Sequence, residues 1–408
     1  LDELHSLLNQ FEQNIIKLNS ENAVKLLELS ELFIKSNEIS IADKQFLHKW
    51  LLFTGKNNYI SLLENEEQRY SWAECACKII QASDFSFNDL LRYRAEELSQ
   101  KALFIDMGKF TPKRFSYEQV WQQSKEIATA IFKSVQGSPR LAIFCENSPE
   151  SAMVDIAALS WDIPVSPLNV HFTNDELTSI FKMMNFNVVV TDTLDRIRQI
   201  EEISKNLLIK PIILHINESI KELTNHIYLP RFIKTISNKE IDLILNKRKR
   251  YSIDQVITVM FTSGSTGRPK GVSFSNYNIV SKRFCRAAAL PAVGNNEVLL
   301  CYLPLFHTFG RYLEMTGMIY WGGTYVFVGN SSADNLLSLF SKVNPTGFIS
   351  VPIRWMQIYD KIMEETENIS SRKEIREKIT SIVGKNLHWG LSAAGYLDPK
   401  IFTFYQKY

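Results

Sequence analysis

The sequence predicts an α/β protein with mostly parallel sheets flanked by helices, preceded by a helical extension. From the N-terminus to about residue 83, apolar residues such as Leu4 and Leu7 recur at helical spacing. After that point, short apolar runs alternate with amphipathic helices, a rhythm typical of parallel sheets covered by helices. A length of 408 residues exceeds a single compact core. We therefore expect a helical extension of unknown role and two α/β subdomains, over residues 1–83, 84–250 and 251–408.

The individual elements follow from the same patterns. In the first subdomain we expect strands at 140–145, 163–168 and 187–191 and helices at 149–161 and 173–184. In the second we expect strands at 255–261, 297–303, 326–328 and 348–351 and helices at 276–289 and 332–343. Thr173 with Glu176 has the spacing of a capping box, and Gly55 is placed to end a helix of the extension. Parallel sheets of this kind bind ligands at the carboxyl ends of their strands.

The charge of the chain argues against some classes of function. The net charge is only +2, so the chain as a whole is not predicted to bind nucleic acid. The densest basic run, residues 247–250, is interpreted as a solvated linker, with attraction of phosphates or anionic lipid as the alternative. Peripheral membrane contact is left open, because no strong basic amphipathic helix supports it. The oligomeric state is left open.

The cysteines and the N-terminus indicate a cytoplasmic protein. The five cysteines are sparse and odd in number, which argues for a reducing compartment and against a disulfide framework. Cys75 and Cys77 face different sides of a predicted helix, so we expect packing rather than zinc binding. The start of the chain does not resemble a signal peptide, and no apolar stretch is long enough to span a membrane.

The stretch MFTSGSTGRPKG, residues 260–271, carries the most specific chemistry. It follows a predicted strand, its glycines allow close approach of the backbone to a ligand, and its hydroxyls and Lys270 supply donors and a cation. Close approach of the backbone, hydrogen-bond donors and a positive charge are the features that binding of a polyphosphate requires. The spacing fits neither the common phosphate loop nor a dinucleotide fingerprint, because Gly264 and Gly267 are three residues apart and Gly271 follows the lysine.

The run T-S-G-S-T-G-R-P-K-G resembles the phosphate-binding loop of the adenylate-forming enzymes, which include acyl-CoA synthetases, luciferases and adenylation domains. The resemblance implies the large N-terminal domain of that superfamily and a loop that holds the β and γ phosphates of ATP. It implies Mg²⁺ on those phosphates, with Thr266 assigned to the metal and Lys270 to catalysis. The implied nucleotide-binding residues of this loop are Thr262, Ser263, Gly264, Ser265, Thr266, Gly267 and Lys270.

Three further segments resemble the branch of long-chain fatty acid:CoA ligases. The run C-Y-L-P-L-F-H-T-F-G-R-Y-L-E, residues 301–314, implies that His307 lies where the substrate carboxylate meets the α phosphate. Gly310 stands where that branch usually has an acidic residue. The segments C-E-N-S-P-E at 145–150 and V-P-I-R-W-M-Q-I-Y-D at 351–360 indicate kinship and are expected to be structural.

Near its end the chain resembles the family again. The run L-S-A-A-G-Y-L, residues 391–397, is similar to the loop that lies against adenine, which assigns Ala394 and Gly395 to the nucleotide. The resemblance begins near residue 85. The family's next elements, a glutamate that helps to hold Mg²⁺ and a lid with a catalytic lysine, have no counterpart up to Tyr408, so we expect these 408 residues alone to turn over poorly.

The implied activity is that of an acid–thiol ligase. ATP would activate a long-chain fatty acid to acyl-AMP, and CoA would then accept the acyl group as a co-substrate. Two alternatives remain: a fatty acyl-AMP ligase that feeds an acyl carrier protein, and a non-catalytic binding or scaffold protein on an adenylation fold. The sequence discloses neither the acyl chain length nor the acceptor.

Overall fold

The computed structural model describes residues 2–36, 39, 41–248, 250–262, 269–367, 369 and 371–408. The chain divides into two compact units, which are interleaved along the sequence. Unit 1 consists of Leu1–Ser99, Tyr117–Glu146 and Glu150–Gly294, and unit 2 of Gln100–Ser116, Asn147–Pro149 and Asn295–Tyr408. In the described ranges, no helix combines the length and apolar composition needed to cross a lipid bilayer.

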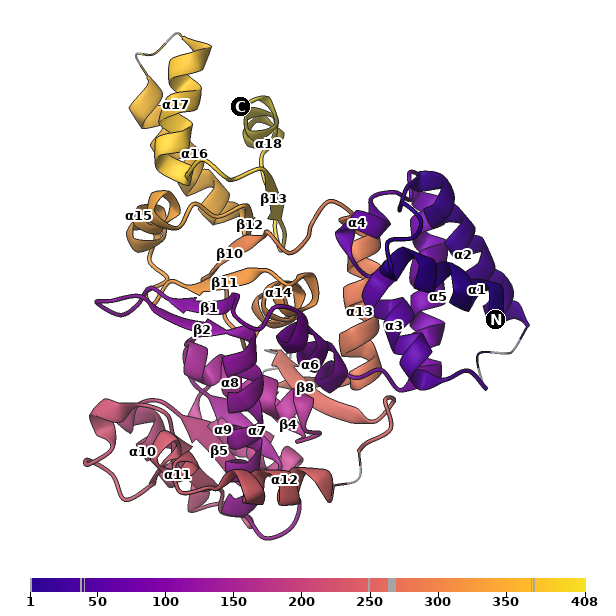
Figure 1. The fold of residues 1–408 in the computed structure, drawn as a ribbon. Helices are drawn as coiled ribbons and strands as arrows, with labels where there is room; N and C mark the ends of the chain where they lie inside the picture. Colours follow the sequence, from indigo (N-terminus) through magenta and orange to yellow (C-terminus); the bar gives the residue numbers. More distant parts are fainter. Residues whose placement is uncertain are drawn as a thin grey trace. The chain divides into compact units, whose positions relative to one another are not determined.

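Unit 1 begins with the predicted helical extension. Its helices are α1 (Asp2–Glu12), α2 (Ser20–Lys35), α3 (Lys44–Thr54), α4 (Asn57–Ile60) and α5 (Glu66–Ser83), followed by α6 (Phe87–Glu97). Side chains of Asn19, Asp43 and Asn65 cap the starts of α2, α3 and α5, because each accepts a hydrogen bond from a backbone amide of the first turn. Helix α5 lies along α13 (Asn276–Ala289), which comes much later in the chain (Figure 1).

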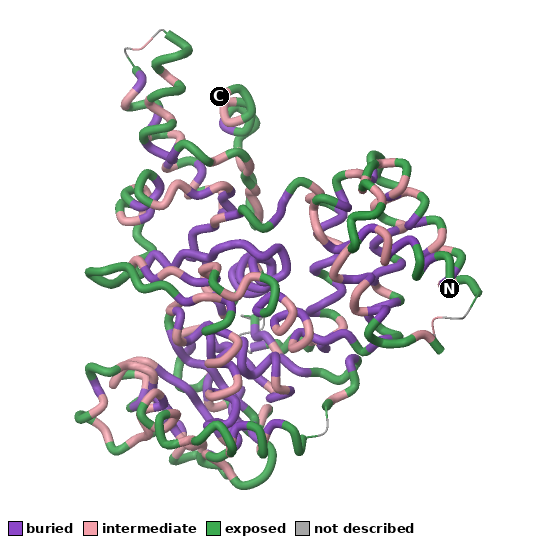
Figure 2. Tube along the Cα trace, viewed as in Figure 1, coloured by how far each residue is buried: buried purple, intermediate pink, exposed green. Residues whose placement is uncertain are grey.

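A seven-stranded sheet forms the centre of unit 1, in the order β7-β6-β5-β3-β4-β8-β9. Its strands are β3 (Leu141–Phe144), β4 (Val165–Pro167), β5 (Val188–Thr191), β6 (Ile212–His215), β7 (Ile227–Tyr228), β8 (Val256–Thr262) and β9 (Lys270–Ser275). All neighbours pair in parallel except β8 and β9. Strands β3 and β5 are buried throughout (Figure 2), which explains their continuous apolar sequences.

Helices alternate with these strands as the sequence predicts. They are α7 (Tyr117–Ser134), α8 (Pro149–Ser160), α9 (Asn174–Met184), α10 (Leu194–Ser204), α11 (Leu229–Ile233) and α12 (Asn238–Asn246), with a 3₁₀ turn at Glu218–Ile220. The predicted capping box is present at α9, where Thr173 and Glu176 bond reciprocally. One core cluster packs α9 and α10 against the sheet through side chains that include Ile180, Val189 and Ile200.

Lys247, Arg248 and Arg250 of the basic run lie on the surface of unit 1, and the two arginines have partners. The Arg250 side chain forms an ion pair with Asp162, with 2.8 Å between Nε and Oδ2. The Arg248 guanidinium lies over the Phe132 ring, 3.4 Å from its centroid. Both residues are exposed, as expected for a solvated linker, and each also has a partner from another element.

Unit 2 contains two small sheets. Strands β10 (Val298–Cys301), β11 (Thr324–Phe327), β1 (Ala102–Asp106) and β2 (Lys113–Ser116) form one in that order, and β12 (Gly347–Ser350) and β13 (Trp389–Ser392) form a parallel pair. A π-helical turn (Phe309–Met315) leads into α14 (Thr316–Trp321), and α15 (Ala333–Val343), α16 (Pro352–Thr366), α17 (Arg372–Val383) and α18 (Pro399–Lys407) follow. Thr346 bonds to Val298 at the start of β10, so β12 also runs beside β10. The expected strands β10, β11 and β12 are confirmed.

Candidate functional site

The predicted phosphate loop connects two antiparallel strands of unit 1. Thr262 ends β8 and Lys270 begins β9, and the two residues are paired across the base of the hairpin. Both side chains are exposed. The other predicted phosphate-binding residues, Ser263, Gly264, Ser265, Thr266 and Gly267, lie outside the described residues. A hydroxyl and an ammonium therefore flank the point where the hairpin leaves the carboxyl end of β8.

The sequence around the hairpin fixes its base. Ile257 and Met260 of β8 are buried, and β8 pairs in parallel with β4, which anchors it in the sheet. On the opposite strand, a Cβ at Gly271 would lie 2.8 Å from Cγ1 of Val259. Glycine directly after Lys270 thus allows the two strands to approach closely.

The predicted His307 lies in unit 2, on the loop that follows β10. Its imidazole is exposed, and its backbone N–H donates to the Pro304 carbonyl at 3.0 Å. Asn147 holds this loop from both sides of the proline. Its Nδ2 donates to the Leu303 carbonyl at 2.7 Å, and its Oδ1 accepts from the Leu305 N–H at 2.9 Å. The C-E-N-S-P-E segment is therefore structural, as expected, and its asparagine positions the His307 loop.

The end of the 301–314 motif, from Gly310 to Glu314, is buried. A Cβ at Gly310 would lie 2.5 Å from the Pro304 carbonyl oxygen, so the acidic residue that the family pattern favours here does not fit. Arg311 and Glu314 are 0% and 1% exposed. The Tyr325 hydroxyl donates to Glu314 Oε2 at 2.6 Å, and burial raises the pKa of the Glu314 carboxyl well above its ordinary value. A neutral carboxyl is the form that this apolar surrounding favours.

The predicted adenine loop follows β13 in the same unit. Ala394 and Gly395 are exposed, and Ala394 has a φ of +64°, a conformation that side chains rarely adopt. The preceding residue, Ala393, donates its N–H to the Ser350 carbonyl at 3.1 Å. Ala394 and Gly395 are therefore accessible to a ligand at the end of β13.

The His307 loop and the Ala394 loop start from adjacent strand ends. Tyr302, directly after β10, has its hydroxyl 2.5 Å from the Ser350 hydroxyl at the end of β12, and Ser350 is also the residue that accepts from Ala393. The structure therefore brings His307 and Ala394 to one edge of unit 2. Thr262 and Lys270 belong to the other compact unit, unit 1.

Glu297 is a site-positioning residue that the sequence did not reveal. It precedes β10, is 5% exposed, and accepts a hydrogen bond from Trp389 Nε1 at 2.8 Å. The Thr346 hydroxyl donates to the same carboxylate. One carboxylate therefore joins the starts of β10, β12 and β13, the strands that end at the two predicted loops. A single glutamate forms no sequence motif, so this role cannot be predicted from the sequence.

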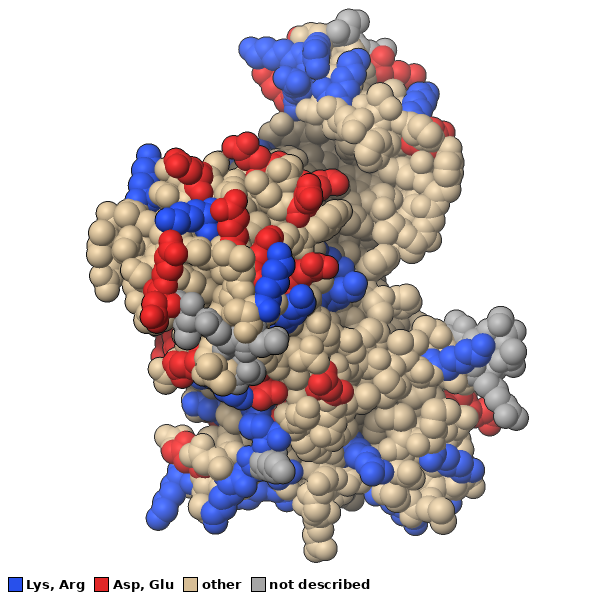
Figure 3. Space-filling view, turned by 90° about the vertical axis from the view of Figure 1, so that its right-hand side faces the viewer, with Lys and Arg blue, Asp and Glu red and all other residues tan. Residues whose placement is uncertain are grey.

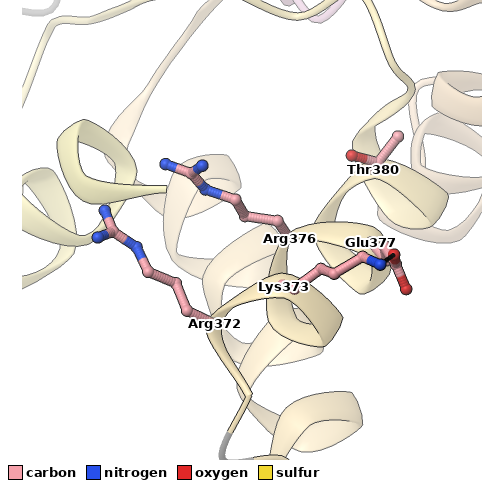
Figure 4. Close-up of a pocket in the computed structure, with 5 residues that line it drawn as sticks. All are labelled: Arg372, Lys373, Arg376, Glu377 and Thr380. Atoms are coloured by element: carbon pink, nitrogen blue, oxygen red, sulfur yellow. Dashed lines mark ion pairs between the residues drawn. The ribbon is translucent and has the colours of Figure 1, made fainter.

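On the face shown in Figure 3, the charged side chains of the described residues form no second candidate binding site. Figure 3 shows cationic and anionic side chains interspersed, with the densest group of cations over α17. There a hollow of about 450 Å³ is lined by Arg372, Lys373, Arg376, Glu377 and Thr380. All five residues come from one helix, and Figure 4 shows Arg372 and Arg376 pointing away from Thr380. Groups that do not converge form no binding site.

The residues present are compatible with Mg²⁺ carried on a polyphosphate. Within the described ranges, no group of three or more His, Cys, Asp or Glu side chains is arranged to hold a metal. Mg²⁺ needs few protein ligands when phosphate oxygens and water complete its octahedron. Thr266, the predicted metal residue, lies outside the described residues.

Comparison with known proteins shows which proteins this chain is similar to. A long-chain-fatty-acid–CoA ligase ACSBG1 of Rattus norvegicus is 26% identical over 261 residues, which are 62% of this chain and 36% of that protein. The chain thus spans about a third of that relative's length. An anthranilate CoA ligase, AuaEII, solved with anthranoyl-AMP, superposes with a TM-score of 0.64 at 15% identity, over 79% of this chain and 57% of that one.

A second solved structure has the same fold. The long-chain-fatty-acid-CoA ligase FadD1 of Archaeoglobus fulgidus superposes with a TM-score of 0.63 at 18% identity, over 79% of this chain and 60% of that one. The family model described as AMP-binding enzyme matches residues 91–408, which include both predicted loops of unit 2 and the phosphate hairpin of unit 1. With its fold, its motifs and this match in agreement, the chain belongs to the AMP-binding enzyme family of adenylate-forming ligases.

Proposed function

We propose that this chain supplies the nucleotide-binding and carboxylate-binding part of a ligase that activates a long-chain fatty acid with ATP. The activated acid would be an acyl-AMP, and the thiol of CoA would then take the acyl group. The observation that carries the proposal is the hairpin base, where Thr262 and Lys270 face each other beside a ten-residue phosphate-loop sequence. The long-chain fatty acid is proposed from the relatives' names and from the L-P-L-F-H motif.

Each predicted residue receives a role that its position allows. Thr262 and Lys270 would bind the departing pyrophosphate, and the Lys270 ammonium would balance charge that develops as the bond to the α phosphate breaks. His307, exposed beyond β10, would orient the carboxylate. The backbone of Ala394 and Gly395 would lie against the adenine ring, in the manner of a family whose AuaEII member was solved with anthranoyl-AMP. Mg²⁺ would supply charge neutralisation on the phosphates.

The domain division and the acceptor are parts of the same proposal. Residues 1–83 would form a docking or packing extension, and the boundaries at 83 and 250 stay predictions. CoA is the proposed acceptor, and a carrier protein is the alternative outcome of an acceptor assay. In that assay the complete protein, an acid and ATP are supplied with CoA in one arm and an acyl carrier protein in the other.

The test measures ATP binding and acid-dependent pyrophosphate release by the complete protein with acids of graded length. Lys270→Ala should weaken ATP binding about tenfold, because one charge-assisted contact to phosphate is lost. Lys239→Ala, at an exposed position of α12, is the matched control and should bind ATP normally. Indifference of ATP binding to Lys270→Ala would favour a scaffold protein. Binding without pyrophosphate release from any acid would refute the ligase.

A further inference from the structure

Two cysteines that are far apart in the sequence meet in unit 1. Cys77 lies on α5 and Cys285 on α13, and the residues are 208 positions apart. Their sulfur atoms are 3.8 Å apart. A disulfide bond is about 2.05 Å long, so the two sulfurs need to approach by about 2 Å to form one. The expectation that Cys77 serves only to pack is therefore incomplete.

The two helices hold this pair in place through further contacts between them. Phe284, the residue before Cys285, packs against Trp72 with the two ring centroids 6.0 Å apart. Beyond it, Arg69 Nε donates to the Ala288 carbonyl at 3.1 Å. The sulfurs thus face each other because an extended interface fixes them.

The pair differs from the other thiols of the chain. Cys75, Cys145 and Cys301 are buried, and burial raises the pKa of each. Cys77 and Cys285 are only half-buried, so a small reagent can reach them. Accessible thiols are the ones that oxidants modify.

Neighbouring groups favour a thiolate on Cys285. The Cys77 thiol donates a hydrogen bond to it, and Lys282 and Arg283 on the same helix add positive charge; together they lower the pKa of Cys285 to about 6. The Tyr277 side chain also hydrogen-bonds Cys77. Cys77 keeps its proton, because a second negative charge beside Cys285 is unfavourable and the pKa of Cys77 is raised.

We propose that Cys77 and Cys285 form a redox modification site, at which a hydroperoxide oxidises Cys285 and Cys77 then closes a reversible disulfide between α5 and α13. In the first step the Cys285 thiolate attacks the terminal peroxide oxygen and the O–O bond breaks. Cys285 becomes a sulfenic acid, and the departing oxygen takes up a proton as water or an alcohol. In the second step the Cys77 sulfur attacks the sulfenic sulfur, the S–S bond forms, and the hydroxyl leaves as water with the Cys77 proton.

The modification joins the helical extension to the helix that follows the phosphate hairpin. Helix α13 begins directly after β9, whose first residue is Lys270. The family model matches residues 91–408, so Cys77 lies on the extension before the matched range and Cys285 lies within it. The site therefore gives the extension a function of its own, a covalent attachment that depends on the surrounding oxidant.

The native protein is treated with hydrogen peroxide, its remaining thiols are blocked with N-ethylmaleimide, and its peptides are mapped by mass spectrometry without reduction. A Cys77–Cys285 linked peptide that dithiothreitol removes is expected. In Cys77→Ser, dimedone should trap a sulfenic acid on Cys285 instead. Cys75→Ser, two positions along the same helix, is the matched control and should still form the linked peptide.

Alkylation of the unmodified protein gives a readout without any substitution. Iodoacetamide should label Cys285 about tenfold faster than Cys75, Cys145 or Cys301, because thiolate character and access both favour it. Absence of the linked peptide in the native protein while other thiols oxidise would overturn the proposal. Equal labelling rates for all five cysteines would overturn it as well.

Discussion

Asn147 is predicted to be essential for the His307 loop. In Asn147→Ala, the buried Leu303 carbonyl and Leu305 N–H lose their partners, which lie 2.7 and 2.9 Å from the amide. Each lost hydrogen bond contributes about 1 kcal/mol, and leaving buried groups unpaired adds to that. We expect the free energy of unfolding to fall by about 3 kcal/mol, which lowers the melting temperature by about 5–10 °C.

The assay combines thermal unfolding with acid-dependent pyrophosphate release. Asn246→Ala, at an exposed position at the end of α12, is the control and should stay within about 0.5 kcal/mol of the parent. Because Asn147 positions His307 rather than touching ATP in the proposed site, Asn147→Ala should weaken the response to the acid more than ATP binding. Equal loss of both responses, without a stability change, would refute a positioning role.

Asn147→Asp separates the two hydrogen bonds. Its carboxylate can still accept from the Leu305 N–H, but it cannot donate to the Leu303 carbonyl until it is protonated. The carbonyl therefore raises the pKa of the new carboxyl above its unfolded value, so the stability deficit should be full at neutral pH and shrink as the pH falls. A deficit that grows on acidification relative to the parent would contradict the observed donor and acceptor assignment.

Three further results are expected. Glu297→Ala should lower the free energy of unfolding by about 3 kcal/mol in a denaturant titration, because Trp389 Nε1 and the Thr346 hydroxyl lose a buried charged acceptor. Ala394→Gly should raise it by about 0.5 kcal/mol, since relief of the φ of +64° outweighs the added freedom of the unfolded chain; a loss would mean that the alanine side chain packs. The iodoacetamide labelling rate of Cys285 should rise with pH through about 6 and then level, because the thiolate fraction saturates there; a rate still rising at pH 8 would indicate an ordinary thiol.

Much of the fold is predictable from apolar runs. The run at 187–191 predicts a buried strand because four consecutive β-formers are covered on both faces of a parallel sheet, and β5 is found there. Strand β9 escaped prediction because its residues are mostly exposed and its alternation contains only two apolar residues, Val272 and Phe274. Strand β1 pairs with β11, more than 200 residues later, a non-local partnership that no local pattern reports.

The candidate site also has parts that the sequence predicts and parts that it does not. The phosphate loop is predictable from its hydroxyls, its glycines and Lys270, and the His307 loop from its resemblance to a ligase motif. The side chains that hold the loops of unit 2 are ordinary residues in ordinary surroundings. Asn147 and Glu297 gain their roles from partners more than 45 positions away, and only the folded chain brings those partners together.

In unit 2, substitutions in the exposed loops and substitutions in the buried residues beneath them should have different effects. The loop residues His307 and Ala394 are exposed, so replacing them changes what a ligand meets and leaves the packing beneath largely intact. Glu297 is 5% exposed, and its side chain accepts from both Trp389 Nε1 and the Thr346 hydroxyl, so its loss would loosen the strands beneath the two loops together. In the proposed site, binding of the carboxylate and of adenine should therefore decline in parallel in Glu297→Ala. Substitutions at the loops should affect them separately, which distinguishes residues that touch a ligand from residues that place those contacts.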